Sequence, residues 1–144
     1  RVTEREKKAE EHDLAYVDLE GDVAIVGCGA GLVMATLDSV AEYGGKPACF
    51  LDLGGGADAE DTKNALEIID MKEGIKSIYL NIFGGITQCD KIAQGIIDYA
   101  PKKPTVVRML GTNEEKGKEM LKEAGYNVVD DMEEGAKTAV EIRE

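Results

Sequence analysis

The sequence contains no tryptophan, one histidine and three cysteines among its 144 residues. A single imidazole excludes chemistry that needs several histidines, such as a three-histidine zinc site. The cysteines Cys28, Cys49 and Cys89 are odd in number and widely spaced, which fits neither a disulfide framework nor a zinc site. We therefore expect a reducing compartment, either the cytoplasm or, in a eukaryote, the mitochondrial matrix.

Positive charge and long apolar runs are also scarce. Lysine and arginine number 17 against 29 aspartate and glutamate residues, which gives a formal net charge of −12. A chain of this charge is repelled by nucleic-acid phosphates and by anionic lipid, so we expect no nucleic acid and no membrane among its partners. No segment approaches the ~18 consecutive apolar residues of a membrane-spanning helix. The apolar share of 43% is typical of a globular protein, and the length fits one domain.

Short apolar runs alternate with segments of helical periodicity from Leu14 onward. Five such alternations predict an α/β domain over residues 14–144, with helices on both faces of a mostly parallel five-stranded sheet and an additional N-terminal strand or hairpin. Residues 1–13 are highly charged, and we expect either the last helix of a preceding region or a solvated arm. The predicted strands cover 14–19, 23–26, 48–53, 77–82, 105–110 and 126–129, and the predicted helices cover 30–43, 59–72, 87–99, 112–124 and 131–144.

Three of the predicted strands end in glycine-rich turns that lead into a helix. These turns are Gly27–Gly31, Gly54–Gly56 and Gly84–Gly85. Ligands of open α/β sheets bind beyond the carboxyl ends of the strands, glycine lets another group approach closely, and helix N-termini attract negative charge. One such turn is equally compatible with a simple change of chain direction. Three at one sheet edge predict a site for an anion such as a phosphate or a carboxylate.

The turns do not match the common nucleotide-binding motifs. None has the Lys and Ser or Thr that follow the last glycine of a P-loop. The dinucleotide pattern G-x-G-x-x-G fits at Gly27 and Gly29, but Leu32 occupies the place of the third glycine, and Asp52 would be the ribose-binding acid. A stand-alone phosphate- or dinucleotide-binding module is therefore retained as an alternative.

Candidate nucleophiles and acid–base groups are few. His12 lies in the charged leader, and Cys89 lies in the first turn of a predicted helix, where the helix dipole would lower its pKa. Cys28 lies inside a glycine turn and is a candidate for lining the site. Arg108 interrupts an apolar strand near its carboxyl end and needs an acidic partner, either from this chain, with Asp52 as one candidate, or from another chain.

At the glycine turns the sequence resembles the C-terminal CoA-ligase domain of succinyl-CoA synthetase (succinate–CoA ligase) β subunits. The order and spacing of Asp52–Ala57 and Asn81–Ile86 are specific to that family. The resemblance implies a flavodoxin-like fold, and it implies that residues 1–13 are the remnant of a preceding ATP-grasp region. It also implies the reaction of an NTP, succinate and CoA to succinyl-CoA, NDP and phosphate, a step of the tricarboxylic acid cycle. The matching stretches are 16–21, 29–34, 50–57, 81–86, 89–90 and 106–113.

The resemblance also implies roles for individual residues and for a partner. The full enzyme would use Mg, ATP or GTP, and CoA, and the phosphorylated histidine would lie on an α subunit. The isolated domain would contain no catalytic residue and no metal site, and we expect it to be inactive. A helix starting at Gly84–Thr87 would aim its N-terminus at the phosphohistidine, with phosphate bound at Gly84 and Gly85. A dicarboxylic acid would bind at Cys28 and at the backbone of Gly85, Ile86 and Thr87.

Two positions depart from the family pattern. Cys28 replaces the usual Asn before the Gly-Ala-Gly turn, and Thr87 replaces the usual Val. A thiol is a weaker hydrogen-bond partner than an amide, so a related acid such as malate is an alternative to succinate. A domain that serves only as a subunit interface, with no ligand of its own, is a further alternative.

Overall fold

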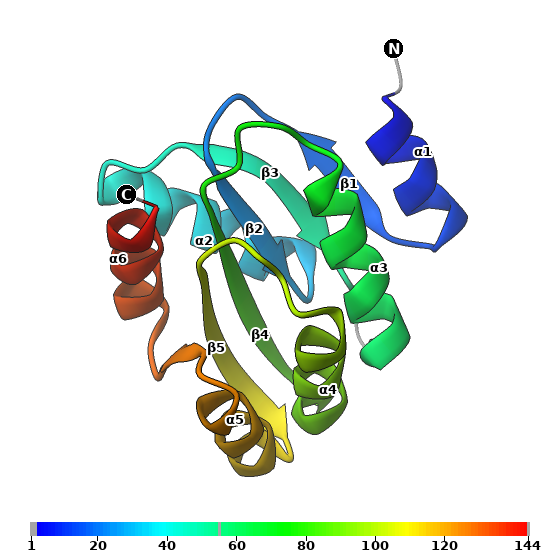
Figure 1. The fold of residues 1–144 in the computed structure, drawn as a ribbon, viewed down its shortest axis with the longest axis vertical. Coiled ribbons are helices and arrows are strands. Elements are labelled where there is room, and N and C mark those ends of the chain that lie inside the picture. The colour runs from blue at the N-terminus through cyan, green and yellow to red at the C-terminus, as the bar shows by residue number, and fades with distance from the viewer. Residues whose placement is uncertain (1–2, 55, 144) are drawn as a thin grey trace.

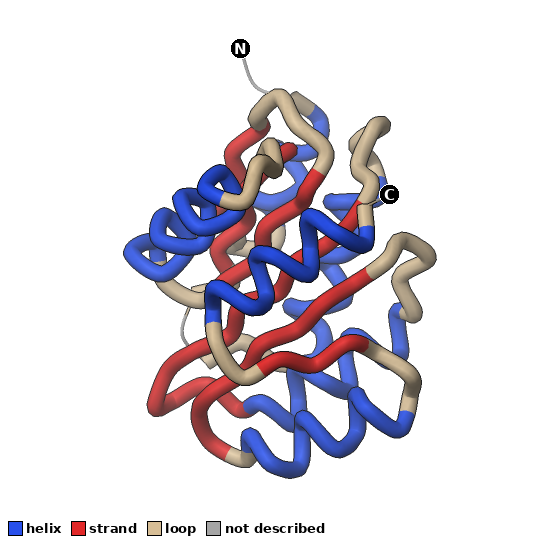
Figure 2. Tube along the Cα trace, turned by 90° about the vertical axis from the view of Figure 1, so that its left-hand side faces the viewer, coloured by secondary structure: helices blue, strands red, loops and turns tan. Residues whose placement is uncertain are grey.

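The computed structural model describes residues 3–54 and 56–143 and confirms the α/β architecture. A six-stranded sheet lies between layers of helices (Figures 1 and 2). The strands are β1 (Ala15–Asp18), β2 (Val23–Gly27), β3 (Pro47–Asp52), β4 (Ser77–Gln88), β5 (Thr105–Thr112) and β6 (Asn127–Val129). The helices are α1 (Glu4–Glu11), α2 (Ala30–Glu42), α3 (Ala59–Asp70), α4 (Cys89–Tyr99), α5 (Glu114–Glu123) and α6 (Met132–Ile142).

The strand order is β1-β3-β2-β4-β5-β6. β1 runs antiparallel to β3, whereas all other neighbours are parallel. The five parallel strands follow the 2-1-3-4-5 order of flavodoxin-like folds, and β1 supplies the expected additional strand at one edge. The chain passes from β2 to β3 on one side and later to β4 on the other. The topological switch point, where ligands of such sheets bind, therefore lies between β2 and β4.

Each face of the sheet is covered by its own set of helices. Ile25 and Tyr79 pack under α2 and α6, whereas Val26 and Leu80 belong to the larger core on the face that carries α3, α4 and α5. Successive strand residues point to opposite faces, so strands covered on both faces are apolar at most positions. β2 is accordingly buried throughout. No helix of the described residues is long and apolar enough to cross a membrane.

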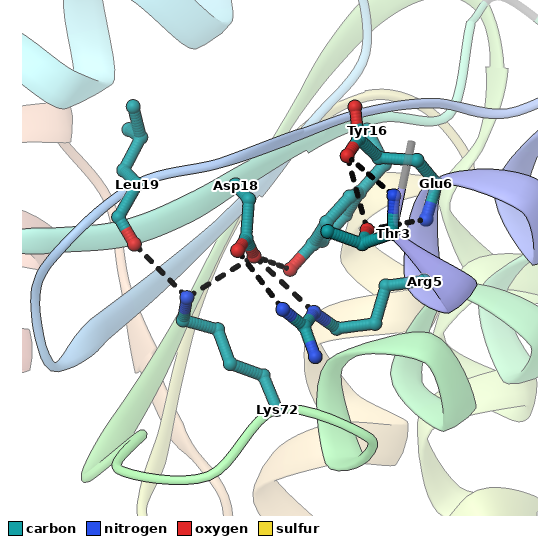
Figure 3. Close-up of polar contacts among 7 residues, drawn as sticks. All are labelled: Thr3, Arg5, Glu6, Tyr16, Asp18, Leu19 and Lys72. Carbon is teal, nitrogen blue, oxygen red and sulfur yellow. Dashed lines mark hydrogen bonds and ion pairs between the residues drawn. The ribbon is translucent and has the colours of Figure 1, made fainter. Parts of the chain in front are cut away.

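Helix α1 is fastened to the domain by a polar cluster around Asp18 (Figure 3). The Asp18 carboxylate accepts hydrogen bonds from Arg5 Nη2 at 2.9 Å, from the Tyr16 hydroxyl at 2.8 Å and from Lys72 Nζ at 3.1 Å. Lys72 also donates to the Leu19 carbonyl at 2.9 Å. The cluster joins α1, β1 and the segment after α3. The origin of residues 1–13 in a preceding region stays a prediction, and residues 1–2 lie outside the described part.

Predicted boundaries are wrong at the carboxyl edge of the sheet, where the strand predicted over 77–82 continues to Gln88. The helix predicted from residue 87 begins at Cys89, and the strand predicted over 105–110 continues to Thr112. β4 and β5 extend together past the other strands, because Gly84 pairs with Gly111 and Gln88 pairs with Thr112. Thr112 therefore pairs in a strand and does not cap α5.

The capping box predicted at the start of α5 is absent. Asn113 occupies the N-cap position in a left-handed conformation (φ 60°) without a side-chain capping bond. The Glu114 carboxylate instead accepts a hydrogen bond from the Gly111 N–H at 3.2 Å. The local pattern predicted the helix correctly but not the way it begins.

Candidate functional site

The candidate site lies at the switch point between β2 and β4. Cys28 directly follows β2, and the segment Gly84–Thr87 lies at the carboxyl end of β4. Gly27 pairs with Asp52 on one side and with Asn81 on the other, so the glycine turns after β2 and β3 and the end of β4 share one edge of the sheet. The position that the fold class favours for a ligand is thus the position of the predicted site residues.

Residues Gly85, Ile86 and Thr87 form a bulge in β4. The pairing with β5 passes from Gly84 opposite Gly111 to Gln88 opposite Thr112, so three residues of β4 have no register partner on β5. The expected helix start at Gly84–Thr87 is therefore wrong, because the chain stays in an extended, bulged conformation until α4 begins. Gly84 itself has φ 146°, and a Cβ there would lie 2.9 Å from Thr87 Oγ1, so only glycine fits this position without strain. Bulges of this kind are frequent next to active sites, where they redirect the backbone.

Thr112 fixes the orientation of the bulge. Its hydroxyl donates a hydrogen bond of 2.8 Å to the Gly85 carbonyl. A trans peptide places the carbonyl and the following N–H on opposite sides. The Ile86 N–H therefore points away from β5. The side chain of Ile86 is 72% exposed, and a Cβ added at Gly85 would meet no atom within 4 Å, so the bulge is open to an approaching group.

Asp52 joins two of the three glycine turns. Its Oδ1 accepts hydrogen bonds from the Gly29 N–H at 2.7 Å and from the Gly54 N–H at 2.8 Å. A carboxylate of the chain itself thus occupies amides that the sequence predicts for an external anion. An anion site at the β4 bulge stays a prediction. The engaged Asp52 argues against a ribose-binding acid, and it does not pair with Arg108.

The structure brings Cys28 and Thr87 together behind the bulge. The two side chains are 8% and 1% exposed. Burial raises the pKa of the Cys28 thiol to about 11, although the nearby Thr87 hydroxyl and the Phe83 backbone act in the opposite direction. Cys28 therefore remains a neutral thiol near pH 7. The two departures from the family pattern contact each other, and Gly85 and Ile86 present the accessible surface.

Cys89 does not have the lowered pKa expected at a helix N-terminus. Burial raises the pKa of its thiol to about 11, and the charges of Glu114 and Asp90 act in the same direction. The thiol is fully buried, and acidic side chains close by outweigh the helix dipole. His12, in contrast, lies far from the switch point, against Asn64 of α3 at 3.3 Å.

The helices that begin at this edge of the sheet differ in whether a side chain caps the free N–H groups of their first turn. Asp58 and Asp61 form a capping box that seals the start of α3. The N-cap residues of α2 and α4 are Gly29 and Gln88, and neither makes a side-chain capping bond. These two helices follow β2 and β4, the strands that flank the switch point. The uncapped amides there are compatible with an anionic ligand.

The described residues show neither a cluster of metal-ligating side chains nor a P-loop motif. No group of three His, Cys, Asp or Glu side chains in 3–54 and 56–143 is arranged to hold a metal ion. None of the glycine turns carries the lysine that a P-loop uses to hold nucleotide phosphates. The described side chains thus do not fit Mg.

Sequence reasoning missed two side chains that shape the site. Thr112 was expected to cap a helix, and its contact with Gly85 depends on how far β4 and β5 extend. Asn81 is fully buried and donates from Nδ2 to Thr36 Oγ1 at 2.9 Å. A buried amide in an apolar strand was the available signal for a polar contact there.

The structure is an α/β domain of flavodoxin-like topology with an open backbone bulge at its switch point. The profile of the CoA-ligase family matches residues 26–142. The chain therefore belongs to the CoA-ligase family.

Relatives with curated names agree with this assignment. The chain is 47% identical over 145 residues to the "Succinate--CoA ligase [ADP-forming] subunit beta" of Staphylothermus marinus. This match covers 98% of this chain and 38% of that protein. The proteins of the same name from Persephonella marina and Methanocaldococcus jannaschii are 49% and 48% identical and cover 97% and 96% of this chain. The match covers 38% and 39% of those two proteins. The chain thus spans about two fifths of the length of the curated relatives it matches.

Solved structures show the same fold at low sequence identity. An ATP citrate lyase from Methanothrix soehngenii, in complex with citrate and coenzyme A, aligns with a TM-score of 0.79 at 18% identity, over 98% of this chain and 43% of that one. A dinucleotide-forming acetyl-coenzyme A synthetase from Ca. Korarchaeum cryptofilum aligns with a TM-score of 0.71 at 14% identity, over 88% and 34% of the two chains. Domains of this shape therefore occur in several CoA-dependent enzymes.

Proposed function

We propose that this chain is the C-terminal CoA-ligase domain of the β subunit of an NTP-dependent succinate–CoA ligase. The family match and the named β-subunit relatives support the ligase class. The observation that carries the proposal is the open bulge at Gly85, Ile86 and Thr87, which lies at the switch point and has no register partner on β5.

The bulge acts on negative charge brought by a partner subunit. The N–H groups of Gly85 and Ile86, the two exposed residues of the bulge, donate to the oxygens of the acid substrate and of the phosphoryl group it receives. Amides fixed by the strand and by Thr112 stabilise developing charge without rearranging, which is the effect that makes preorganised donors catalytic. The uncapped start of α4 adds its partial positive charge. The phosphorylated histidine, the nucleotide, Mg and CoA belong to other parts of the enzyme.

The acid substrate is a dicarboxylate whose identity depends on the surroundings of Cys28. The Cys28 side chain is neutral and nearly buried, and Thr87 lies against it. A thiol offers weaker hydrogen bonds than the usual Asn amide, so the acid depends more on the backbone of the bulge. Succinate is the expected substrate, and a close relative such as malate is the alternative.

Reconstitution of the enzyme tests this function. The full β-type polypeptide that carries this chain is combined with an α-type subunit, and formation of acyl-CoA is measured with ATP or GTP, CoA, and either succinate or malate. We expect activity with both subunits present and none with residues 1–144 alone. Turnover by the isolated chain, or a complete enzyme that activates neither acid, would contradict the proposal.

A further inference from the structure

Arg108 on β5 has an incompletely satisfied guanidinium group. Nη1 donates to Asn81 Oδ1 at 3.1 Å, and this is the one hydrogen bond that the side chain makes within the described residues. Nε is buried without a partner. The chain itself encloses Nε, so an acceptor from outside can reach the guanidinium through Nη2, which is not buried and makes no hydrogen bond within the described residues.

The two other arginines in the described part of the chain each pair with a carboxylate. Arg5 lies 2.9 Å from Asp18, and Arg143 lies 3.3 Å from Asp22. The chain carries 29 acidic residues against 17 basic ones, so acidic partners are plentiful. Asp52, the candidate within the chain, is occupied by two glycine amides. Within the described residues, Arg108 therefore has no carboxylate partner.

The guanidinium is held in a fixed position. Asn81 accepts from Arg108 and donates to Thr36 Oγ1 at 2.9 Å, and Thr36 in turn donates to the Leu32 carbonyl at 2.7 Å. The guanidinium also lies over the Phe83 ring, with its Cζ 5.6 Å from the ring centroid. A preorganised arginine loses little conformational freedom when an acceptor binds to it.

The surface beside Arg108 is apolar. Phe83 and Leu110 are opposite each other in the β4–β5 ladder, on the same face as Arg108, and are 47% and 37% exposed. Arginine and aromatic side chains are enriched at the centres of protein interfaces. A small carboxylate would need an enclosing cavity, and the cavity of about 540 Å³ beside α3, α4 and α5 does not include Arg108. The exposed apolar pair therefore favours a protein over a small molecule as the source of the acceptor.

We propose that Arg108, Phe83 and Leu110, called here the Arg108 face, dock an acidic side chain of the partner subunit. Arg108 binds the carboxylate, and the exposed Phe83–Leu110 pair is covered by apolar atoms around it. The identity of the partner as an α-type subunit rests on the function proposed above. The face lies on the extension of β4 and β5 that also carries the bulge, so docking there would set the position of the partner relative to the bulge.

Binding measurements between full-length subunits test the Arg108 face. The dissociation constant of the complex is measured for the wild type, for Arg108→Gln and, as a matched control, for Arg143→Gln, which removes the same charge at the opposite edge of the sheet. We expect Arg108→Gln to weaken assembly about 10- to 100-fold, because a charge-assisted bond at a desolvated position is lost. Arg143→Gln should leave the dissociation constant unchanged.

Two further readouts separate docking from other roles. At saturating partner concentration, Arg108→Gln should leave the KM for the acid unchanged, whereas a rise in KM with unchanged assembly would show that Arg108 binds the substrate and would overturn the proposal. Leu110→Ser, which removes exposed apolar surface beside Arg108 and leaves the Arg108–Asn81 bond in place, should weaken assembly and leave the thermal unfolding midpoint of the chain unchanged. Unchanged assembly of Leu110→Ser would overturn the proposal.

Failure of the proposed function and failure of the Arg108 face give different results. If the wild-type polypeptide binds no α-type subunit, the proposed function fails. If the wild type assembles and Arg108→Gln assembles with the same dissociation constant, the Arg108 face is wrong and the proposed function is unaffected.

Discussion

The substitution Asp18→Asn tests whether the polar cluster in Figure 3 holds α1 on the domain. Asparagine keeps the shape of the side chain but removes the charge that attracts Arg5 and Lys72. Burial alone would raise the pKa of Asp18, but the hydrogen bonds from Arg5, Tyr16 and Lys72 outweigh it and hold the pKa at about 2, against an ordinary value of 3.8. The folded state therefore binds the Asp18 proton more weakly than the unfolded state does.

The size and sign of the effect follow from this difference. A pKa that is lower in the folded state adds stability above the unfolded value of 3.8, and that stability is lost as the pH falls from 3.8 towards 2. The difference corresponds to about 2 kcal/mol at 1.36 kcal/mol per pKa unit, after allowance for partial exposure to solvent. We expect Asp18→Asn to lower the free energy of unfolding by about 2 kcal/mol at pH 7.

Urea unfolding of the 144-residue chain at pH 7, 5, 3.5 and 2.5 measures this effect. The deficit of Asp18→Asn should be full at pH 7 and pH 5 and should shrink below pH 4. Asp38→Asn, which removes the same charge from an exposed position on α2, should cost less than about 0.5 kcal/mol at pH 7. A deficit of Asp18→Asn that is equal at pH 7 and pH 2.5, or no deficit at all, would refute the reasoning.

Three further predictions concern the candidate site. Asp52→Ala removes the acceptor shared by the Gly29 and Gly54 amides and should lower the free energy of unfolding by about 1–3 kcal/mol in urea titrations; an unchanged midpoint would contradict this role. Thr112→Val should reduce kcat of the assembled enzyme about three- to tenfold, because the bulge loses the hydrogen bond that orients it. Thr112→Ser keeps the hydroxyl and should retain most of the rate. Equal rates for the Val and Ser variants would contradict the role of the hydroxyl. Cys28→Asn in the full enzyme should change the ratio of kcat/KM for succinate and malate about tenfold, and an unchanged ratio would remove Cys28 from the acid site.

The fold was largely predictable from sequence because its strongest signals are local. Runs such as Val23–Val26 are apolar at every position, as a strand buried on both faces requires. Glycine turns then mark the ends of these strands. The predicted parallel sheet and the flavodoxin-like order are confirmed by the observed topology. The start of α1 also carried a local signal, the capping box of Thr3 and Glu6, which the prediction overlooked.

The geometry of the site was less predictable because it depends on contacts between distant segments. Whether Gly84–Thr87 begins a helix or extends a strand is decided by pairing with Gly111 and Thr112 on β5. The capture of the Gly29 amide by Asp52 likewise joins residues 23 positions apart. Spacing along the chain located the switch point but could not show which turns remain open to a ligand.

The most direct test of the anion-binding bulge is the single-turnover rate of phosphoryl transfer in the assembled enzyme with Gly85→Pro and Gly85→Ala. Proline removes the N–H of residue 85, whereas alanine retains it, and a Cβ at this position meets no atom within 4 Å. We expect proline to reduce the rate about 100- to 1,000-fold, as loss of one preorganised donor does, and alanine to reduce it less than tenfold. A proline variant that assembles normally and transfers phosphate at the rate of the alanine variant would contradict the account.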